Sequence, residues 1–169
     1  MVDATAAQAS AQASRQRELY SLLIPLKGER LLVPRMCVAE VIAFAETERA
    51  RDADTPEWFL GTIEWSTRRI PVVSLDGPET EPRRAKRNRT RVVVFHALTN
   101  ALPGGYYGLL TQGFPQLVRV NPDVLTLDRE QPLPAHVPAV CRVRMIHEYP
   151  LVPDVDRLEA MIATLPAVG

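Results

Sequence analysis

Short apolar segments separated by polar turns are the feature that most constrains the fold of this chain. From Leu19 onward, strand-like segments of four to eight residues recur about every ten to fifteen residues, and the chain holds 15 prolines. Short strands at regular spacing, bounded by Gly, Pro and polar turn residues, are typical of all-β barrels and sandwiches. The pattern therefore favours an all-β body over an α/β repeat.

Composition limits the size and setting of that body. The 169 residues are 46% hydrophobic and 24% charged, which suits one domain or two small lobes that share a core. The longest apolar runs are far shorter than a membrane span, and the first residues lack the pattern of a signal peptide. We therefore expect a cytoplasmic protein without membrane insertion. Twenty basic and 20 acidic residues give zero formal charge, so no overall field attracts nucleic acid.

Two hairpins are predicted in the first half of the chain. Residues 22–24 and 31–33 flank a polar, glycine-containing turn, and residues 58–65 and 70–75 flank a second turn at 66–69. Pro71 has no amide hydrogen, so its strand is expected to be a sheet edge or to begin with a bulge. Between the hairpins, periodicity fits a helix or a strand over residues 36–44 equally well. We favour a strand with a brief helical or bulged start.

The second half of the chain predicts further strands and one helix. The strands are expected at residues 92–98, 107–110, 114–120 and 139–146, with a short arm around Leu151. The closing helix is indicated by an apolar stripe that falls on one face. Asp156 is its expected cap, with Glu159 in the capping-box position. The stripe consists of Val155, Leu158, Met161, Ile162 and Leu165.

The termini and one long loop lie outside this pattern. Residues 1–17 are rich in Ala, Gln and Ser without an apolar stripe, so we expect a flexible tail before a domain at 18–165, with 166–169 as the C-terminal end. Residues 76–91 form a polar loop in which six of the nine residues from 83 to 91 are basic. A solvated loop, a protein contact and a nucleic-acid contact remain open. The first is favoured and the nucleic-acid contact is ranked last, because no aromatic residues interleave with the arginines to stack on bases.

Residues suited to catalysis or to metal binding are few. His96, His136 and His147 have no His or Cys partner at ligand spacing, and no phosphate loop or nucleophile elbow occurs. Cys37 and Cys141 lie among apolar neighbours, as buried cysteines do. We predict no catalytic residue, no metal and no cofactor. An enzyme would need Cys141, His147 and Glu148 to converge, so the residues alone indicate a cytoplasmic all-β interaction module.

Four stretches, taken in order, resemble the CheW-like domain family, the adaptor module of bacterial chemosensory arrays. The first runs from Leu22 to Val41, and the second from Pro56 to Leu75 contains a glycine and an apolar I-P-V arm. The third is the glycine-led strand at residues 107–110 with the apolar strand after it. The last runs from Val143 to Leu158 and carries D-x-D-x-L before the helix. The likeness spans about residues 18–165, and it is nearest to accessory (ChpC-type) adaptors of systems that control type IV pili.

The resemblance implies a fold and a function. The fold would be two SH3-like, five-stranded β-barrel lobes that share a core, with a short C-terminal helix. The module would perform no catalysis. It would couple the cytoplasmic tip of a methyl-accepting chemoreceptor to the CheW-like regulatory domain of a CheA-type histidine kinase, in control of type IV pili and twitching motility and near membrane receptor arrays. The alternative is a CheW-like scaffold that has lost kinase coupling and organises pilus or cell-pole components.

The resemblance also implies partner-binding residues. Val38, Gly61, Ser66 and Leu117 match positions at which the family contacts receptor, and Glu40 matches a residue tied to the kinase and to local structure. The alternatives are that Val38 and Leu117 are ordinary core, and that Gly61 serves only a backbone with positive φ.

One departure from the family pattern concerns Glu40. The family's Asn-Leu-Arg-Gly turn is replaced by residues 64–67, so Ser66 stands where the family has an arginine that can pair with this glutamate. Glu40 is therefore expected to lack that partner unless Arg68 or Arg69 reaches it.

Overall fold

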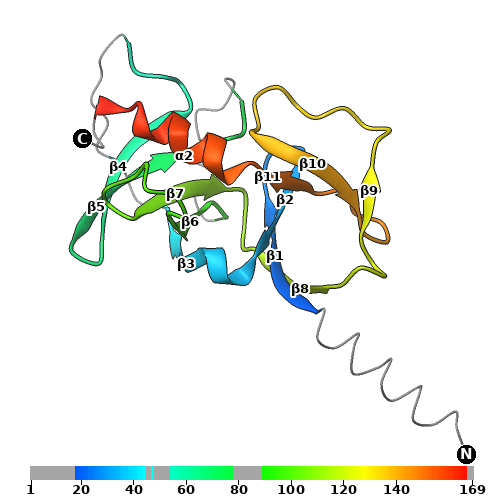
Figure 1. Ribbon diagram of the computed structural model, residues 1–169. Helices are drawn as coiled ribbons and strands as arrows, with labels where there is room; N and C mark the ends of the chain where they lie inside the picture. The colour runs from blue at the N-terminus through cyan, green and yellow to red at the C-terminus, as the bar shows by residue number, and fades with distance from the viewer. Residues whose placement is uncertain (1–17, 45–46, 48–53, 78–88, 167–169) are drawn as a thin grey trace, which may run out of the picture.

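The computed structural model describes residues 18–44, 47, 54–77 and 89–166 (Figure 1). The expected tail at 1–17, most of the loop at 76–91 and residues 167–169 lie outside the described residues. The elements are β1 (Leu19–Pro25), β2 (Arg30–Pro34), the 3-10 helix η1 (Arg35–Cys37), β3 (Val38–Ala43), β4 (Phe59–Trp65), β5 (Arg68–Val73), β6 (Arg91–His96), β7 (Tyr106–Thr111), β8 (Gln116–Val120), β9 (Thr126–Asp128), β10 (Ala139–Arg144), β11 (Leu151–Pro153) and α2 (Val155–Ala163).

The strands form two sheets, each the basis of one lobe. The six-stranded lobe has the order β8-β1-β2-β11-β10-β9, and the five-stranded lobe has the order β3-β6-β7-β5-β4. The two lobes lie side by side, and α2 runs across the five-stranded lobe from the end of β11 (Figure 1). The predicted all-β fold with a C-terminal helix is confirmed. One lobe has a sixth strand because β9 forms in the proline-rich passage, where no strand was predicted.

Three apolar clusters account for the packing. Two of them each lie within one lobe. The third lies between the sheets and beneath α2 and contains residues from both lobes. Burial of apolar surface is the main force that favours folding. The shared cluster therefore makes one body of the two lobes. It includes Ile24, Leu31, Val73, Phe95, Leu109, Leu151, Leu158 and Ile162.

The strand that carries Pro71 is not where the sequence placed it. β5 lies between β4 and β7, so it is an interior strand, and the ladder irregularity falls on its partner between Phe59 and Gly61. Pro71 is tolerated there because the pairing of β5 with β7 begins at Val72, after the residue that lacks an amide hydrogen. The expectation of a brief helical or bulged start before β3 is confirmed, since η1 precedes it and a bulge follows Val38.

The start of α2 also differs from the expectation. Asp154, not Asp156, is the N-cap residue, and its side chain accepts a hydrogen bond from the Arg157 amide at 3.0 Å. Glu159 is fully buried and bonds another segment: it accepts hydrogen bonds from the amides of Leu98 and Thr99 at 2.7 and 2.8 Å, and from the Thr99 hydroxyl. The carboxylate thus fastens α2 to the loop after β6.

Among the described residues no helix has the length and apolar character that a membrane span requires.

Candidate protein-binding site

Four of the five predicted contact residues fall in two places, and the fifth, Gly61, is buried within β4. Val38 begins β3, is half-buried, and packs against the shared cluster. Leu117 on β8 is 55% exposed and pairs in register with Leu22, which also packs against the shared cluster. Val38 and Leu117 therefore approach the side where the two lobes meet. Glu40 and Ser66 lie at the end of the five-stranded lobe, on β3 and on the turn that joins β4 to β5.

A small apolar depression opens where the lobes meet. Its volume is about 60 Å³, and its walls come from both lobes: β2, η1, β6 and β11 with the start of α2. Cys37 is one of the lining residues, and burial raises the pKa of its thiol. Leu98 lies at the rim and is exposed. Apolar side chains that remain exposed next to a depression are suited to contact with another protein.

Glu40 does have a partner, and the partner is a tryptophan. The Trp65 Nε1–H donates a hydrogen bond to Glu40 Oε2 over 2.7 Å. β3 and β4 are the two outer strands of the five-stranded sheet, so this bond joins its edges. A second bond runs from the hydroxyl of Thr47, which lies in the segment after β3, to the Leu60 carbonyl on β4 at 2.6 Å. The sheet is therefore curled until its outer strands meet, as in a barrel.

Arg68, which was considered as a partner for Glu40, contacts other residues instead. Its Nη1 donates to the Gly104 carbonyl at 3.3 Å, and its guanidinium carbon lies 5.5 Å from the centre of the Tyr106 ring. Sequence reasoning looked only for basic residues to pair with Glu40 and missed the indole N–H. The available signal was position, because Trp65 precedes Ser66 in the turn that replaces the family's arginine.

Aromatic rings extend the surface beside Glu40. The Trp65 and Tyr106 ring centres are 4.8 Å apart, and His96 lies 5.2 Å from Tyr106. All three side chains are partly buried and partly open to solvent. Tryptophan and tyrosine in such positions offer large rigid contact areas with polar handles, which protein interfaces favour.

The backbone at Gly61 and Ser66 is unusual. Gly61 has φ of 121° at the bulge in β4, a conformation that favours glycine. Ser66 and Thr67 both have positive φ, 45° and 66°, and form the exposed two-residue turn of the hairpin. Gly61 thus has a structural reason to be glycine whether or not it contacts a partner. Ser66 places a short side chain at the tip of the turn.

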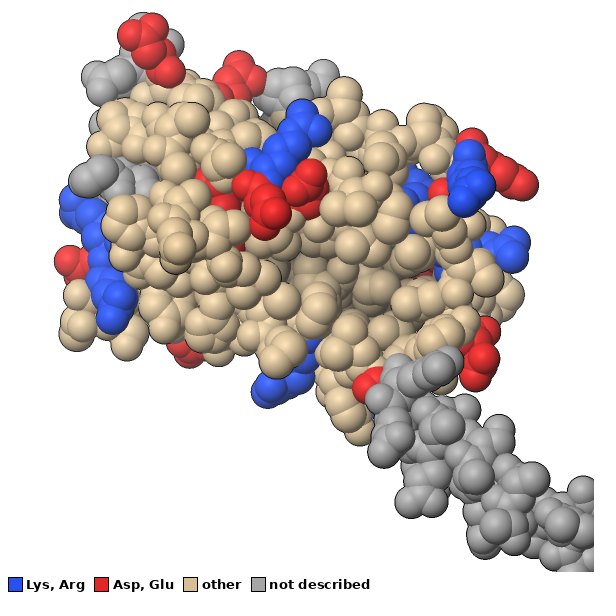
Figure 2. Space-filling model, in the orientation of Figure 1, with Lys and Arg blue, Asp and Glu red and all other residues tan. Residues whose placement is uncertain are grey.

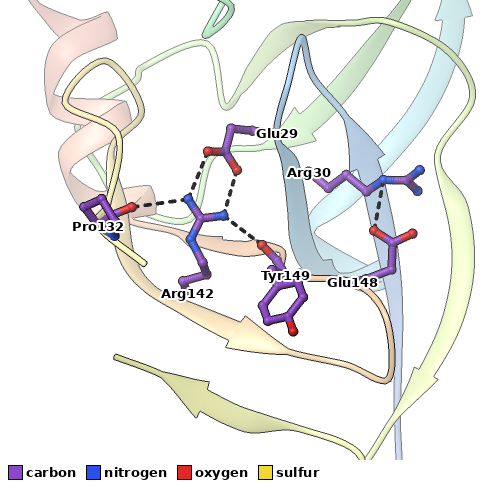
Figure 3. A network of polar contacts seen from close by, with 6 residues as sticks. All are labelled: Glu29, Arg30, Pro132, Arg142, Glu148 and Tyr149. Atoms are coloured by element: carbon purple, nitrogen blue, oxygen red, sulfur yellow. Dashed lines mark hydrogen bonds and ion pairs between the residues drawn. The ribbon is translucent and has the colours of Figure 1, made fainter. Parts of the chain in front are cut away.

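A second polar network ties the β10–β11 hairpin to the β1–β2 turn (Figure 3). Arg142 is only 6% exposed and donates to both carboxylate oxygens of Glu29, at 2.8 and 2.9 Å, and to the carbonyls of Tyr149 and Pro132. The hydrogen bond to Glu29 is the main reason that the pKa of Arg142 is raised. Next to it, Arg30 pairs with Glu148 at 3.2 Å. The network borders a pocket of about 450 Å³.

The three residues that an enzyme would need have separate surroundings. Cys141 packs against the apolar cluster inside the six-stranded lobe, Glu148 is paired with Arg30, and His147 is exposed in a turn. Within the described part of the chain, no group of three or more His, Cys, Asp or Glu side chains could hold a metal ion. On the face shown in Figure 2, charged side chains are scattered over a mostly uncharged surface.

The chain matches one protein-family model and is similar in fold to a solved structure. The model for the CheW-like domain matches residues 21–160. Among solved structures, the scaffolding protein TtCheW from Thermoanaerobacter tengcongensis is similar with a TM-score of 0.60 and 14% sequence identity, over 79% of this chain and 82% of that one. No curated protein shows significant sequence similarity to the chain.

Proposed function

Because the chain belongs to the CheW-like domain family, we propose that it is a non-catalytic signalling adaptor that couples methyl-accepting chemoreceptors to a CheA-type histidine kinase. The observation that carries the proposal is the family match, which extends over both lobes. Two curled sheets around a shared core, with an apolar depression between them, provide a rigid body that can hold two partners at once.

The candidate site divides between the two partners. Val38 and Leu117, near the line where the lobes meet, are proposed to contact the helical cytoplasmic tip of the receptor. Ser66, on the exposed β4–β5 turn at the same end of the lobe as Glu40, is proposed as a further receptor contact, and Gly61, which is buried in β4, is proposed to act through the shape of that strand. Glu40, oriented by Trp65 and flanked by aromatic rings, is proposed to contact the CheW-like regulatory domain of the kinase.

We place the adaptor in the cytoplasm beside membrane receptor arrays, in a system that controls type IV pili and twitching motility. The support for this placement is the divergence of the β4–β5 turn, where Trp65 and Ser66 replace the family's Leu-Arg pair. Deletion of the gene should then reduce twitching on a surface and leave swimming unchanged. Normal twitching in the deletion strain would contradict this assignment.

A reconstituted signalling assay tests the coupling itself. Receptor tips, kinase and the purified adaptor are combined, and kinase autophosphorylation is followed with and without the adaptor. The proposal expects receptor-dependent phosphorylation to require the adaptor. The test variant is Val38→Asp, which places a charge where the lobes meet. The matched control is Arg119→Gln, an exposed change on β8. The first should abolish coupling and the second should preserve it.

The alternative is a CheW-like scaffold that has lost kinase coupling and organises pilus or cell-pole components. The observation that favours it is the absence of the family's arginine at Ser66. In that case the protein would still bind receptor or pilus components, but phosphorylation in the reconstituted assay would not depend on it.

A further inference from the structure

Tyr107 on β7 is completely buried, and its hydroxyl has no hydrogen-bond partner among the described residues. Its ring stacks on Phe95, with the ring centres 5.3 Å apart and the planes nearly parallel. Buried tyrosine hydroxyls are normally hydrogen-bonded, because an unpaired polar group inside a protein has lost its hydration without compensation. The ring of Tyr107 therefore favours folding, whereas its hydroxyl opposes it.

The side chains near the hydroxyl leave it a free donor. Burial raises the pKa of Tyr107, and so do the neighbouring Glu159 and Cys37, so the hydroxyl keeps its proton at neutral pH. Glu159 is the nearby acceptor, but its carboxylate already accepts hydrogen bonds from the amides of Leu98 and Thr99 and from the Thr99 hydroxyl. The hydroxyl thus has a hydrogen bond to give and no carboxylate left to receive it.

Tyr107 and Cys37 both line the apolar depression where the lobes meet. The depression has a volume of about 60 Å³, which is room for one small side chain. Cys37 directly precedes Val38, one of the proposed receptor contacts. A polar donor in an otherwise apolar wall therefore adjoins the proposed receptor surface.

The rim of the depression combines apolar side chains with charges of both signs. Met36, next to Cys37, is 77% exposed, and Leu98 is 58% exposed. The charged and imidazole side chains that line the depression, or directly adjoin a lining residue in the chain, belong to Arg35, His96, Asp154 and Asp156. A rim of mixed sign does not match the uniformly anionic surface of a membrane or a nucleic acid. It does match the usual anatomy of a protein interface.

The shape of the depression favours a helix over the face of a β-lobe. Side chains on one face of a helix recur at each turn, about 5.4 Å apart, so one can enter the depression while its neighbours rest on Met36 and Leu98. A flat sheet surface, as expected of the kinase regulatory domain, would cover the opening without reaching its base. Of the two proposed partners, the helical receptor tip therefore fits.

We propose that Tyr107 is a specificity-determining residue for the receptor, because its hydroxyl donates a hydrogen bond to a serine or threonine that the receptor tip inserts between the lobes. The inference rests on the proposed function, which places the receptor tip on this side of the molecule. It adds a polar contact at a position that the family resemblance did not indicate. The hydroxyl that is unpaired in the free adaptor is satisfied in the complex.

The free protein tests whether the hydroxyl lacks a partner. Tyr107→Phe keeps the ring on Phe95 and removes only the hydroxyl, so the urea midpoint of unfolding should stay the same or rise. The matched control is Tyr149→Phe, the same change at an exposed residue outside the depression, which should leave the midpoint unchanged. A midpoint for Tyr107→Phe well below that of the control would show that the hydroxyl is already hydrogen-bonded in the free protein. That result would overturn the proposal.

Binding measurements test the contact itself. Tyr107→Phe should raise the Kd for a soluble fragment of the receptor tip by about tenfold, because the inserted oxygen loses its donor. The Kd of this variant for the kinase regulatory domain should change by less than about twofold, as should the receptor Kd of Tyr149→Phe. An unchanged receptor Kd in Tyr107→Phe, or an equal rise of its Kd for both partners, would overturn the proposal.

Thiol alkylation tests where the receptor tip binds, and it separates this inference from the proposed function. Cys37 lines the depression, whereas Cys141 packs in the six-stranded lobe. Bound receptor tip should slow the reaction of Cys37 with N-ethylmaleimide and leave the reaction of Cys141 unchanged. If the tip binds without protecting Cys37, only this inference is overturned. If the wild-type protein does not bind the tip at all, the proposed function fails and this inference fails with it.

Discussion

At the scale of single residues, Trp65 shows how a neutral donor, one residue before the place where the family has an arginine, can supply the hydrogen bond that a charged side chain would make. The turn lacks an arginine, yet Glu40 is held at 2.7 Å by the indole N–H. The bond differs from an ion pair in one respect: the glutamate keeps its net negative charge at the surface. Within the described residues no basic side chain forms an ion pair with Glu40, so a partner that recognises this end of the molecule meets a carboxylate beside aromatic rings.

Removal of the indole N–H tests this link. Trp65→Phe keeps a ring for Tyr106 but removes the donor, so the free energy of unfolding should fall by about 1 kcal/mol in urea denaturation. Glu40→Ala should cost a similar amount. The double variant should lose little more than either single variant, because both remove the same bond. Fully additive losses would mean that the two side chains do not interact in solution.

The buried carboxylate of Glu159 supports a second prediction. Glu159→Leu leaves two amides and a hydroxyl at Leu98 and Thr99 without their acceptor, so unfolding should become easier by about 2–4 kcal/mol. Asp156→Asn, an exposed change on the same helix, should cost less than about 0.5 kcal/mol. Thermal unfolding followed by circular dichroism measures both. Equal losses would contradict the buried role of Glu159.

The role of Glu159 also marks a limit of what its sequence position predicts. A glutamate three residues after Asp156 fits a capping box, and local spacing alone favours that reading. The structure uses Asp154 as the cap and turns Glu159 inward, toward residues about 60 positions earlier. Such a partner is visible only once the chain is folded. The Trp65 partner of Glu40 was missed for a different reason, because only basic side chains were considered as partners for that carboxylate.

At the scale of elements, the sequence predicts hairpins well and the order of strands in a sheet poorly. The β1–β2 and β4–β5 hairpins, the brief helical start before β3 and the closing helix follow from local patterns. β9 was missed because it is three residues long in a proline-rich passage. The interior place of β5 depends on its parallel pairing with β7, which no local pattern encodes.

The network beneath the β10–β11 hairpin provides a prediction at this scale. Arg142→Met leaves the Glu29 carboxylate without its buried partner, so stability should fall by about 3–5 kcal/mol. Adding Glu29→Gln should recover part of that loss. Arg30→Gln, which breaks the exposed pair with Glu148, should cost less than about 1 kcal/mol. Urea denaturation of the wild type and the three variants measures these changes in the free energy of unfolding. A small effect of Arg142→Met would mean that the pair does not brace the hairpin.

At the scale of the whole molecule, the shared cluster predicts that the lobes unfold together. Trp65 reports on the five-stranded lobe, Trp58 on the shared cluster against which it packs, and the Cys141 thiol on the six-stranded lobe. Tryptophan fluorescence and thiol accessibility should therefore give the same urea midpoint. Two separated midpoints would show that the cluster between the sheets does not couple the lobes.

The strand order of the six-stranded lobe has a consequence for how the protein is made. β1 and β2 come from the beginning of the chain, whereas β8 to β11 come from its second half, and the five-stranded lobe is inserted between them. On the ribosome, the first hairpin emerges long before its neighbours β8 and β11 are translated. The inserted lobe can close first, while the opening hairpin waits with its apolar face uncovered. Nascent chains of this protein are thus most exposed to chaperones and proteases until the last strand leaves the exit tunnel.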